Sequence, residues 1–318
     1  MNAATETSES FVAPAAAPRP VRPFYWSVKR ELWENRSLMI APLVVGAIVF
    51  LGLLSRAVNI SEIQAILQTV TADKVGKVAT GLYVGVGIAV SIVMNIAVFF
   101  YLLDALQGER KDRSVLFWKS MPVSDTTTVL SKLFTGSVVS IAIVVVVSIV
   151  TQILVLLLTS VVLMIASVNP LPLWTESQLF QVTLAIVYAQ IAMALWFAPV
   201  DAWLLLVSSW AKRVTILWAV LPPVALMVFE RMAIGTRYVQ DMINYRVITG
   251  LKTMFVAHPE DVGVIVSDNG ETIRAPHNVL AALDPVGFFS NPWLWVGLVV
   301  AAGFVAAAIW MRRYREPL

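Results

Sequence analysis

Long apolar runs separated by short polar stretches dominate the pattern along the chain. Six of these runs reach the roughly 20 residues that a helix needs to cross the hydrocarbon core of a bilayer. The runs lie at 38–57, 79–106, 133–166, 179–207, 214–232 and 292–311. Because backbone exposed to lipid must satisfy its own hydrogen bonds, we expect helices here and not strands. The predicted fold class is an all-α membrane protein with six transmembrane helices.

Three of the runs carry further structural signals. The third is longer than a bilayer requires, so we expect it to tilt or to project past the headgroups. In the fifth run, Pro222 and Pro223 predict a kink or a break. In the second, Gly81 and Gly85 have a G-x-x-x-G spacing, and together with Gly87 they permit close contact with a neighbouring helix.

The segment 23–37, which precedes the first run, has an amphipathic pattern. Phe24, Tyr25, Val28 and Leu32 fall near one face at helical spacing, and charged residues occupy the rest of the helical wheel. This pattern predicts a helix that lies in the headgroup layer and leads into the first span. A linker helix in the cytosol is the alternative.

Other polar segments complete the predicted organisation. Residues 1–22 have the composition of a disordered tail. The loop 107–132 joins the second and third spans, and residues 233–291 are long enough to form a small folded cap. Within that cap, residues 262–266 alternate in polarity and Ser-Asp-Asn-Gly follows at 267–270, which predicts a β-hairpin.

The placement of Lys and Arg predicts the orientation of the spans. Basic residues gather in the N-terminal segment, in the loop 107–132, at Lys212 and Arg213, and in the tail that ends the segment 292–318. Short loops rich in Lys and Arg stay in the cytoplasm. We therefore expect both termini and the loop 107–132 to be cytoplasmic and residues 233–291 to be external.

The composition agrees with a membrane protein and excludes several kinds of site. Hydrophobic residues make up 58% of the chain and charged residues 14%, with a mean hydropathy of +0.79. Soluble domains have about 45–50% apolar and about 25% charged residues. The chain has no cysteine and only two histidines, both in the polar segment 233–291, which argues against a metal site in the membrane.

Motifs for ATP binding and hydrolysis are missing from the sequence. There is no G-x-x-x-x-G-K-[ST] phosphate loop, and neither H-E-x-x-H nor G-x-S-x-G occurs. We therefore expect no catalytic residues, no enzyme activity of the chain itself and no cofactor bound by it.

Polar residues inside the runs are candidates for a functional role because they are costly in hydrocarbon. Asp201, in the fourth run, is the clearest case, while Asp104 and Glu230 lie nearer the ends of helices. Ser91 and Asn95 lie one turn apart in the second run. These side chains fit a substrate path, and they fit equally well a contact between helices or with the interface.

The loop between the second and third runs has the most distinctive composition. Its charged start leads directly into an apolar stretch that includes Phe117 and Trp118, Pro122 closes that stretch, and Ser124 or Asp125 can cap the third span. Large aromatic residues with a polar rim are typical of a protein-docking surface. An aromatic belt at headgroup level is the alternative, and the residues alone do not decide between them.

The loop DALQGERKDRSVLFWKSMPVSDTTTVLSKL resembles the corresponding loop of ABC type-2 permeases, the membrane subunits of ATP-binding-cassette exporters. The stretches at 30–46 (RELWENRSLMIAPLVVG) and 199–213 (PVDAWLLLVSSWAKR) are similar to the same family. The external segment departs from the family, because it is longer than the re-entrant hairpin common there.

This resemblance implies a permease in the cytoplasmic (inner) membrane of a bacterium that exports an unidentified substrate with energy from ATP. ATP and Mg would be bound by two copies of a separate ATPase subunit, and the permease would pair with a second copy of itself or with a related permease. It also implies that 23–37 is a connecting helix and that a coupling helix in the loop contacts the ATPase. The implied contact residues are Arg110, Lys111, Asp112, Arg113, Phe117, Trp118 and Lys119.

Other classes of function remain open at this point. An ion-coupled secondary transporter would use Asp201 or Glu230 as its ion or proton site. The missing motifs argue against an intramembrane enzyme, and a membrane scaffold is a further alternative. Membrane lipid is an expected partner in every case, and nucleic acid is not.

Overall fold

The computed structural model describes residues 22–57, 72–111, 123–249, 253–255, 262–266, 272–276 and 279–314. Within this part of the chain, six helices are long and apolar enough to cross a bilayer. These spans are Ser37–Ala57, Gly76–Lys111, Asp125–Ile165, Leu171–Trp210, Thr215–Ala233 and Pro292–Tyr314. Each contains most or all of one predicted run, so the prediction of six membrane-crossing helices is confirmed.

The helices of the first four spans and their connections follow a simple order. The helix α1 precedes the first span, and α9 is a short helix before the fourth. In chain order they are α1 (Pro23–Glu34), α2 (Ser37–Ala57), α4 (Ala72–Asp104), α5 (Gln107–Lys111), α7 (Asp125–Phe134), the π-helical turn η1 (Thr135–Val139), α8 (Ser140–Ile165), α9 (Leu171–Thr175) and α10 (Leu179–Trp210). Ser124 caps α7 by accepting a hydrogen bond from the backbone N–H of Thr127. Of the two caps that the sequence predicts, Ser124 and Asp125, the structure thus has Ser124.

The last third of the chain contains two spans and the segment between them. The bounds are α11 (Thr215–Ala233), α12 (Tyr238–Asn244), the π-helical turn η2 (Tyr245–Thr249), β1 (Val262–Val266), β2 (Thr272–Pro276), the 3-10 turn η4 (Leu280–Ala282), α14 (Pro285–Ser290) and α15 (Pro292–Tyr314). The strands β1 and β2 pair antiparallel, with Val262 opposite Pro276 and Val266 opposite Thr272, where the sequence predicts a hairpin.

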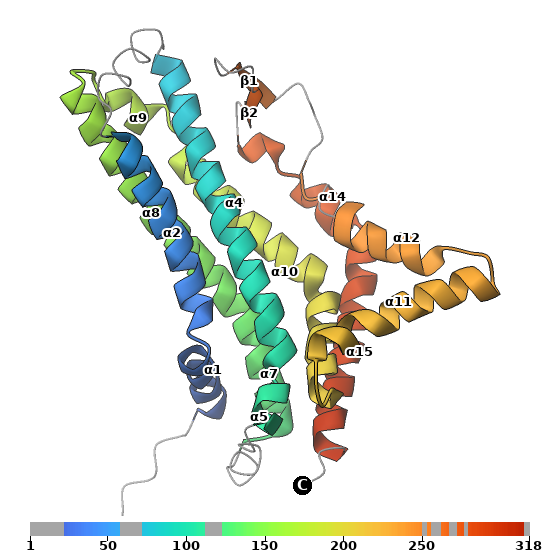
Figure 1. The fold of residues 1–318 in the computed structure, drawn as a ribbon. Helices are drawn as coiled ribbons and strands as arrows, with labels where there is room; N and C mark the ends of the chain where they lie inside the picture. The colour runs from blue at the N-terminus through green and yellow to red at the C-terminus, as the bar shows by residue number, and fades with distance from the viewer. Residues whose placement is uncertain are drawn as a thin grey trace, which may run out of the picture.

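The bundle is built from two sets of contacts. The helix α2 packs against α4 and α8, and α10 packs along α15 and also against α4 (Figure 1). At Gly46 the backbone of α2 comes so close to α8 that an added Cβ would lie 2.6 Å from Thr151 Oγ1. Gly87 likewise contacts Ile186 of α10. Among the described residues, Gly81 and Gly85 have no neighbour within 4 Å of an added Cβ, so the close contact that their spacing permits is not made inside the described bundle.

The helix α11 diverges from the other spans and ends near α12 (Figure 1). It is continuous through Pro222 and Pro223, so the sequence does not break the helix there. At its end, the carboxylate of Glu230 accepts hydrogen bonds from the Tyr238 and Val239 backbone N–H groups, at 2.6 and 2.8 Å. Glu230 therefore fixes the turn from α11 to α12, because it satisfies backbone donors at the start of α12.

One end of the bundle collects elements that are far apart in the sequence. The helices α1 and α5, the start of α7 and the last turns of α15 meet there, and the described chain also ends there (Figure 1). We call it the basic end, because Lys212, Arg213 and Arg313 also lie there. The helix α9 lies at the opposite end.

Candidate functional site: a buried charge cluster at the basic end

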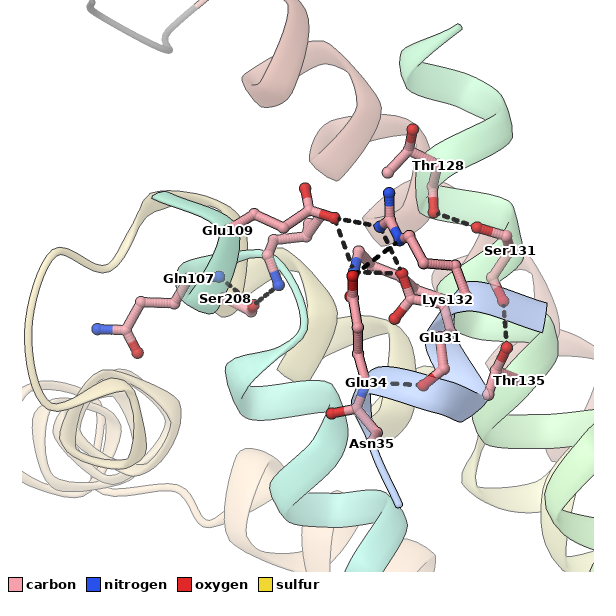
Figure 2. A network of polar contacts seen from close by, with 12 residues as sticks. Glu31, Glu34, Asn35, Gln107, Glu109, Thr128, Ser131, Lys132, Thr135 and Ser208 are labelled. Atoms are coloured by element: carbon pink, nitrogen blue, oxygen red, sulfur yellow. Dashed lines mark hydrogen bonds and ion pairs between the residues drawn. The ribbon is translucent and has the colours of Figure 1, made fainter. Parts of the chain in front are cut away.

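A cluster of ionised side chains joins four elements at the basic end. Glu31 of α1 and Glu109 of α5 face the cations of Arg30, Lys132 and Arg312, which come from α1, α7 and α15 (Figure 2). Asp125, at the start of α7, completes the set that we call the charge cluster.

Glu109 is the centre of this cluster. Its Oε1 lies 2.7 Å from Arg30 Nη2 and 3.0 Å from Lys132 Nζ, and its Oε2 lies 2.8 Å from Arg312 Nη1. Glu31 Oε1 lies 2.8 Å from both Arg30 Nη2 and Lys132 Nζ. Glu109 and Glu31 therefore each bridge two or more cations, so the removal of either carboxylate leaves several partners uncompensated.

Most of the charge cluster is withdrawn from solvent. The side chains of Glu31, Lys132 and Arg312 are 1%, 2% and 3% exposed, and that of Glu109 is 7% exposed. Ionised groups this deeply buried persist only when they are paired and hydrogen-bonded. The cluster meets this condition because its three cations face three anions and Tyr101 donates a hydrogen bond to Glu31 Oε2 at 3.0 Å.

Arg30 lies at the edge of the cluster and is 18% exposed. Burial alone would lower the pKa of its guanidinium, but Glu31, Glu109 and Glu34 outweigh that effect and raise the pKa above its ordinary value. Arg30 therefore keeps its charge at any physiological pH. Glu34, which reaches Arg30 Nε at 3.5 Å, is half-exposed, and burial raises the pKa of its carboxyl.

The orientation of α1 explains how its charges reach the bundle. Tyr25, Trp26 and Trp33 are more than half exposed, and the Lys29 ammonium lies over the rings of Trp26 and Trp33 at 5.0 and 4.8 Å from their centroids. The aromatic residues therefore face outward, as suits a helix at the headgroup level. Glu31 lies on the inner face instead.

The start of the loop between α4 and α7 is fixed to the end of α10. Arg110 Nη2 donates hydrogen bonds to the carbonyl oxygens of Ser208 and Ala211, and Ser208 Oγ accepts one from the Leu106 N–H at 2.7 Å. A cation at the carboxyl end of a helix binds carbonyls that lack a partner in the helix. Arg110 thus has a structural contact, and its predicted docking contact stays a prediction.

The other predicted docking residues are placed only in part. Lys111 is exposed at the end of α5. Asp112, Arg113, Phe117, Trp118 and Lys119 lie outside the described residues. The two anchored ends of their segment, Glu109 and Lys132, are joined in the charge cluster by the 3.0 Å contact.

The structure also places the polar residues predicted in the spans. Ser91 Oγ accepts a hydrogen bond from Gln190 Nε2 at 2.6 Å, which joins α4 to α10. Asn95 is exposed and donates to the Ser91 carbonyl of its own helix. Asp201 is partly buried in α10, and its carboxylate makes no hydrogen bond or ion pair with the described residues. Of the two roles predicted for Ser91 and Asn95, helix contact is thus observed for Ser91.

Sequence reasoning missed Glu31, Glu109 and Arg312 as members of one site. Glu109 lies 79 positions from its partner Arg30 and 203 positions from its partner Arg312, so no local motif connects the members of the cluster. One signal was available: Glu31 lies three residues after Val28 and seven after Phe24, on the apolar side of α1. A charge on that face indicates a buried partner.

No family model matches this chain, and comparison with the curated proteins and with the solved structures also finds no match.

Proposed function

We propose that this chain is the permease subunit of an ABC exporter, driven by a separate ATPase that docks on the loop between α5 and α7. The charge cluster is the observation that best supports this function. The cluster joins α5 and α7, which are the two ends of the loop, to α1 and α15. A force on the loop would therefore move these four elements as one unit. A transporter whose ATPase is a separate subunit needs such a rigid connection, because the movement of the ATPase must reach the transmembrane helices.

The site of docking would be the apolar stretch around Phe117 and Trp118, with charged residues at its rim. ATP binding would bring two ATPase subunits together and push the loop. The charge cluster would pass this movement to α2 through α1 and to α10 through α15, changing access to a path between two permease copies. ATP and Mg would be bound only by the ATPase, and the substrate stays undefined.

Co-purification tests this function. The tagged chain is extracted from its native membrane, and bound proteins with a phosphate-loop sequence are identified by mass spectrometry. We expect an ATPase that is retained by the wild type and lost from the double variant Phe117→Ala/Trp118→Ala. The matched control is Trp310→Ala/Tyr314→Ala, which removes two exposed aromatic residues at the same end and should retain the ATPase.

Three results would contradict the proposal. These are the absence of any ATPase from the wild-type complex, its retention by the loop variant, and equal loss from both variants.

One observation favours a second function, ion-coupled secondary transport. Asp201 is a carboxylate inside a span without a partner among the described residues, and such groups mark ion or proton sites. In that case Asp201→Asn would abolish gradient-driven flux in vesicles without ATP. Unchanged flux would discard this alternative.

A further inference from the structure

A pocket at the basic end is separate from the charge cluster. It has a volume of about 590 Å³ and lies between the end of α4, the helix α5 and the start of α11. Its walls come from the ends of the second and fifth spans, so it lies at the depth of the lipid headgroups.

The polar part of the pocket is strongly cationic. Lys111, Lys212 and Arg213 line it, and Asp104 is the one carboxylate among the lining residues. The side chains of these three cations form no ion pair with other described residues. The pocket therefore presents an excess of positive charge that has not been neutralised within the described protein.

The amino end of α11 adds to the positive potential of the pocket. Val214 precedes the helix in a left-handed conformation, with φ 50°, and no side chain caps the helix. Thr215 and Ile216, in its first turn, line the pocket. The amino end of a helix attracts anions through its free N–H groups and its dipole. It acts here in the same direction as the three side-chain cations.

The remaining wall is apolar and open to the surroundings. Phe100, Val214 and Ile216 are 57%, 62% and 45% exposed, although each is a large hydrophobic residue. A free inorganic anion would leave this wall unused. A ligand with an anionic head and an apolar tail satisfies both parts of the pocket.

We propose that the pocket binds an anionic glycerophospholipid of the surrounding leaflet, of the phosphatidylglycerol type. The phosphate lies against Lys111, Lys212, Arg213 and the start of α11. Asp104 accepts a hydrogen bond from a headgroup hydroxyl, and the acyl chains follow Phe100 and Ile216. This inference does not depend on the proposed export function, because it concerns this chain alone.

Native mass spectrometry of the full-length chain in detergent micelles measures this binding directly. The chain is titrated with phosphatidylglycerol, with phosphatidylcholine of the same acyl chains, and with the soluble headgroup glycerophosphoglycerol. We expect one retained phosphatidylglycerol per chain and no comparable retention of the other two compounds.

Matched variants assign the binding to the pocket. Lys212→Ala/Arg213→Ala should weaken phosphatidylglycerol binding about 25-fold, since each basic residue near an anionic lipid contributes about 1 kcal/mol. The control Arg22→Ala/Arg36→Ala removes two exposed cations at the same end, outside the pocket, and should leave the affinity unchanged.

The proposal is overturned if the pocket variant binds as the wild type does, or if the control loses as much affinity. Equal binding of phosphatidylcholine would show that the cations are not used. Equal binding of the soluble headgroup would show that the site serves free phosphate esters and that the apolar wall plays no part. Because no ATPase is present, none of these results bears on the export proposal.

Discussion

Neutralising Glu109 tests whether the charge cluster stabilises the basic end. The change Glu109→Gln keeps the size of the side chain and removes the charge that faces Arg30, Lys132 and Arg312 at 2.7, 3.0 and 2.8 Å. Removing one partner of a buried ion pair costs about 3–5 kcal/mol, because the other charge stays buried without compensation. Since Arg30 is 18% exposed and water can reach it, we take the lower limit. We therefore expect Glu109→Gln to lower the free energy of unfolding by about 3 kcal/mol.

The control is Glu34→Gln, an identical chemical change in the neighbouring carboxylate. Glu34 is 51% exposed and only approaches Arg30 Nε at 3.5 Å. Exposed ion pairs contribute about 0–1 kcal/mol, so the control should lose less than about 1 kcal/mol.

Unfolding in mixed micelles titrated with sodium dodecyl sulfate, followed by circular dichroism, gives the free energies of unfolding for both variants. A second arm combines Glu109→Gln with Arg312→Gln. The double variant should lose less stability than the sum of the two single losses, by about 0.5–3 kcal/mol, because the two residues contact each other. Equal small losses for Glu109→Gln and Glu34→Gln, together with strict additivity in the double variant, would refute the reasoning.

Two further predictions concern packing and the turn after the fifth span. Gly46→Ala places a Cβ against Thr151 Oγ1 and should lower the free energy of unfolding by about 1–3 kcal/mol in the same assay. The control Gly52→Ala, in the same helix, adds a Cβ that meets no described atom within 4 Å and should not lower it. Equal effects would contradict the described contact of α2 with α8. Glu230→Gln removes the charge that accepts backbone hydrogen bonds at the start of α12, so hydrogen exchange at those amides should accelerate about 10-fold or more. Unchanged exchange would mean that Glu230 does not fix this turn.

The number and type of the membrane helices followed from the sequence because length and hydropathy are local properties. The runs at 38–57 and 214–232 coincide with α2 and α11 to within about a residue. The cap at Ser124 was also predictable, since one side chain and the following turn decide it. These are features that a short window of sequence contains.

The charge cluster was not predictable in the same way. Glu31, Glu109 and Arg312 lie on three separate elements, and only the packing of α1, α5 and α15 brings them together. The glycines of α4 show the same limit from the other side. Their spacing permits a helix contact, but which face of α4 meets a neighbour depends on the whole bundle, and no described residue lies within 4 Å of a Cβ added at Gly81 or Gly85.

The central claim, that the loop between the second and third spans is reached by a cytoplasmic ATPase, is tested most directly by the location of that loop. The chain has no cysteine, so Lys119→Cys gives a single thiol in the loop and Ser167→Cys gives one at the opposite end of the bundle. Each variant is labelled with a membrane-impermeant maleimide in intact cells and in inverted vesicles. We expect Cys labelling at position 119 only in inverted vesicles and at position 167 only in intact cells. Labelling at position 119 in intact cells would place the loop outside, where no ATPase can reach it, and would contradict the account.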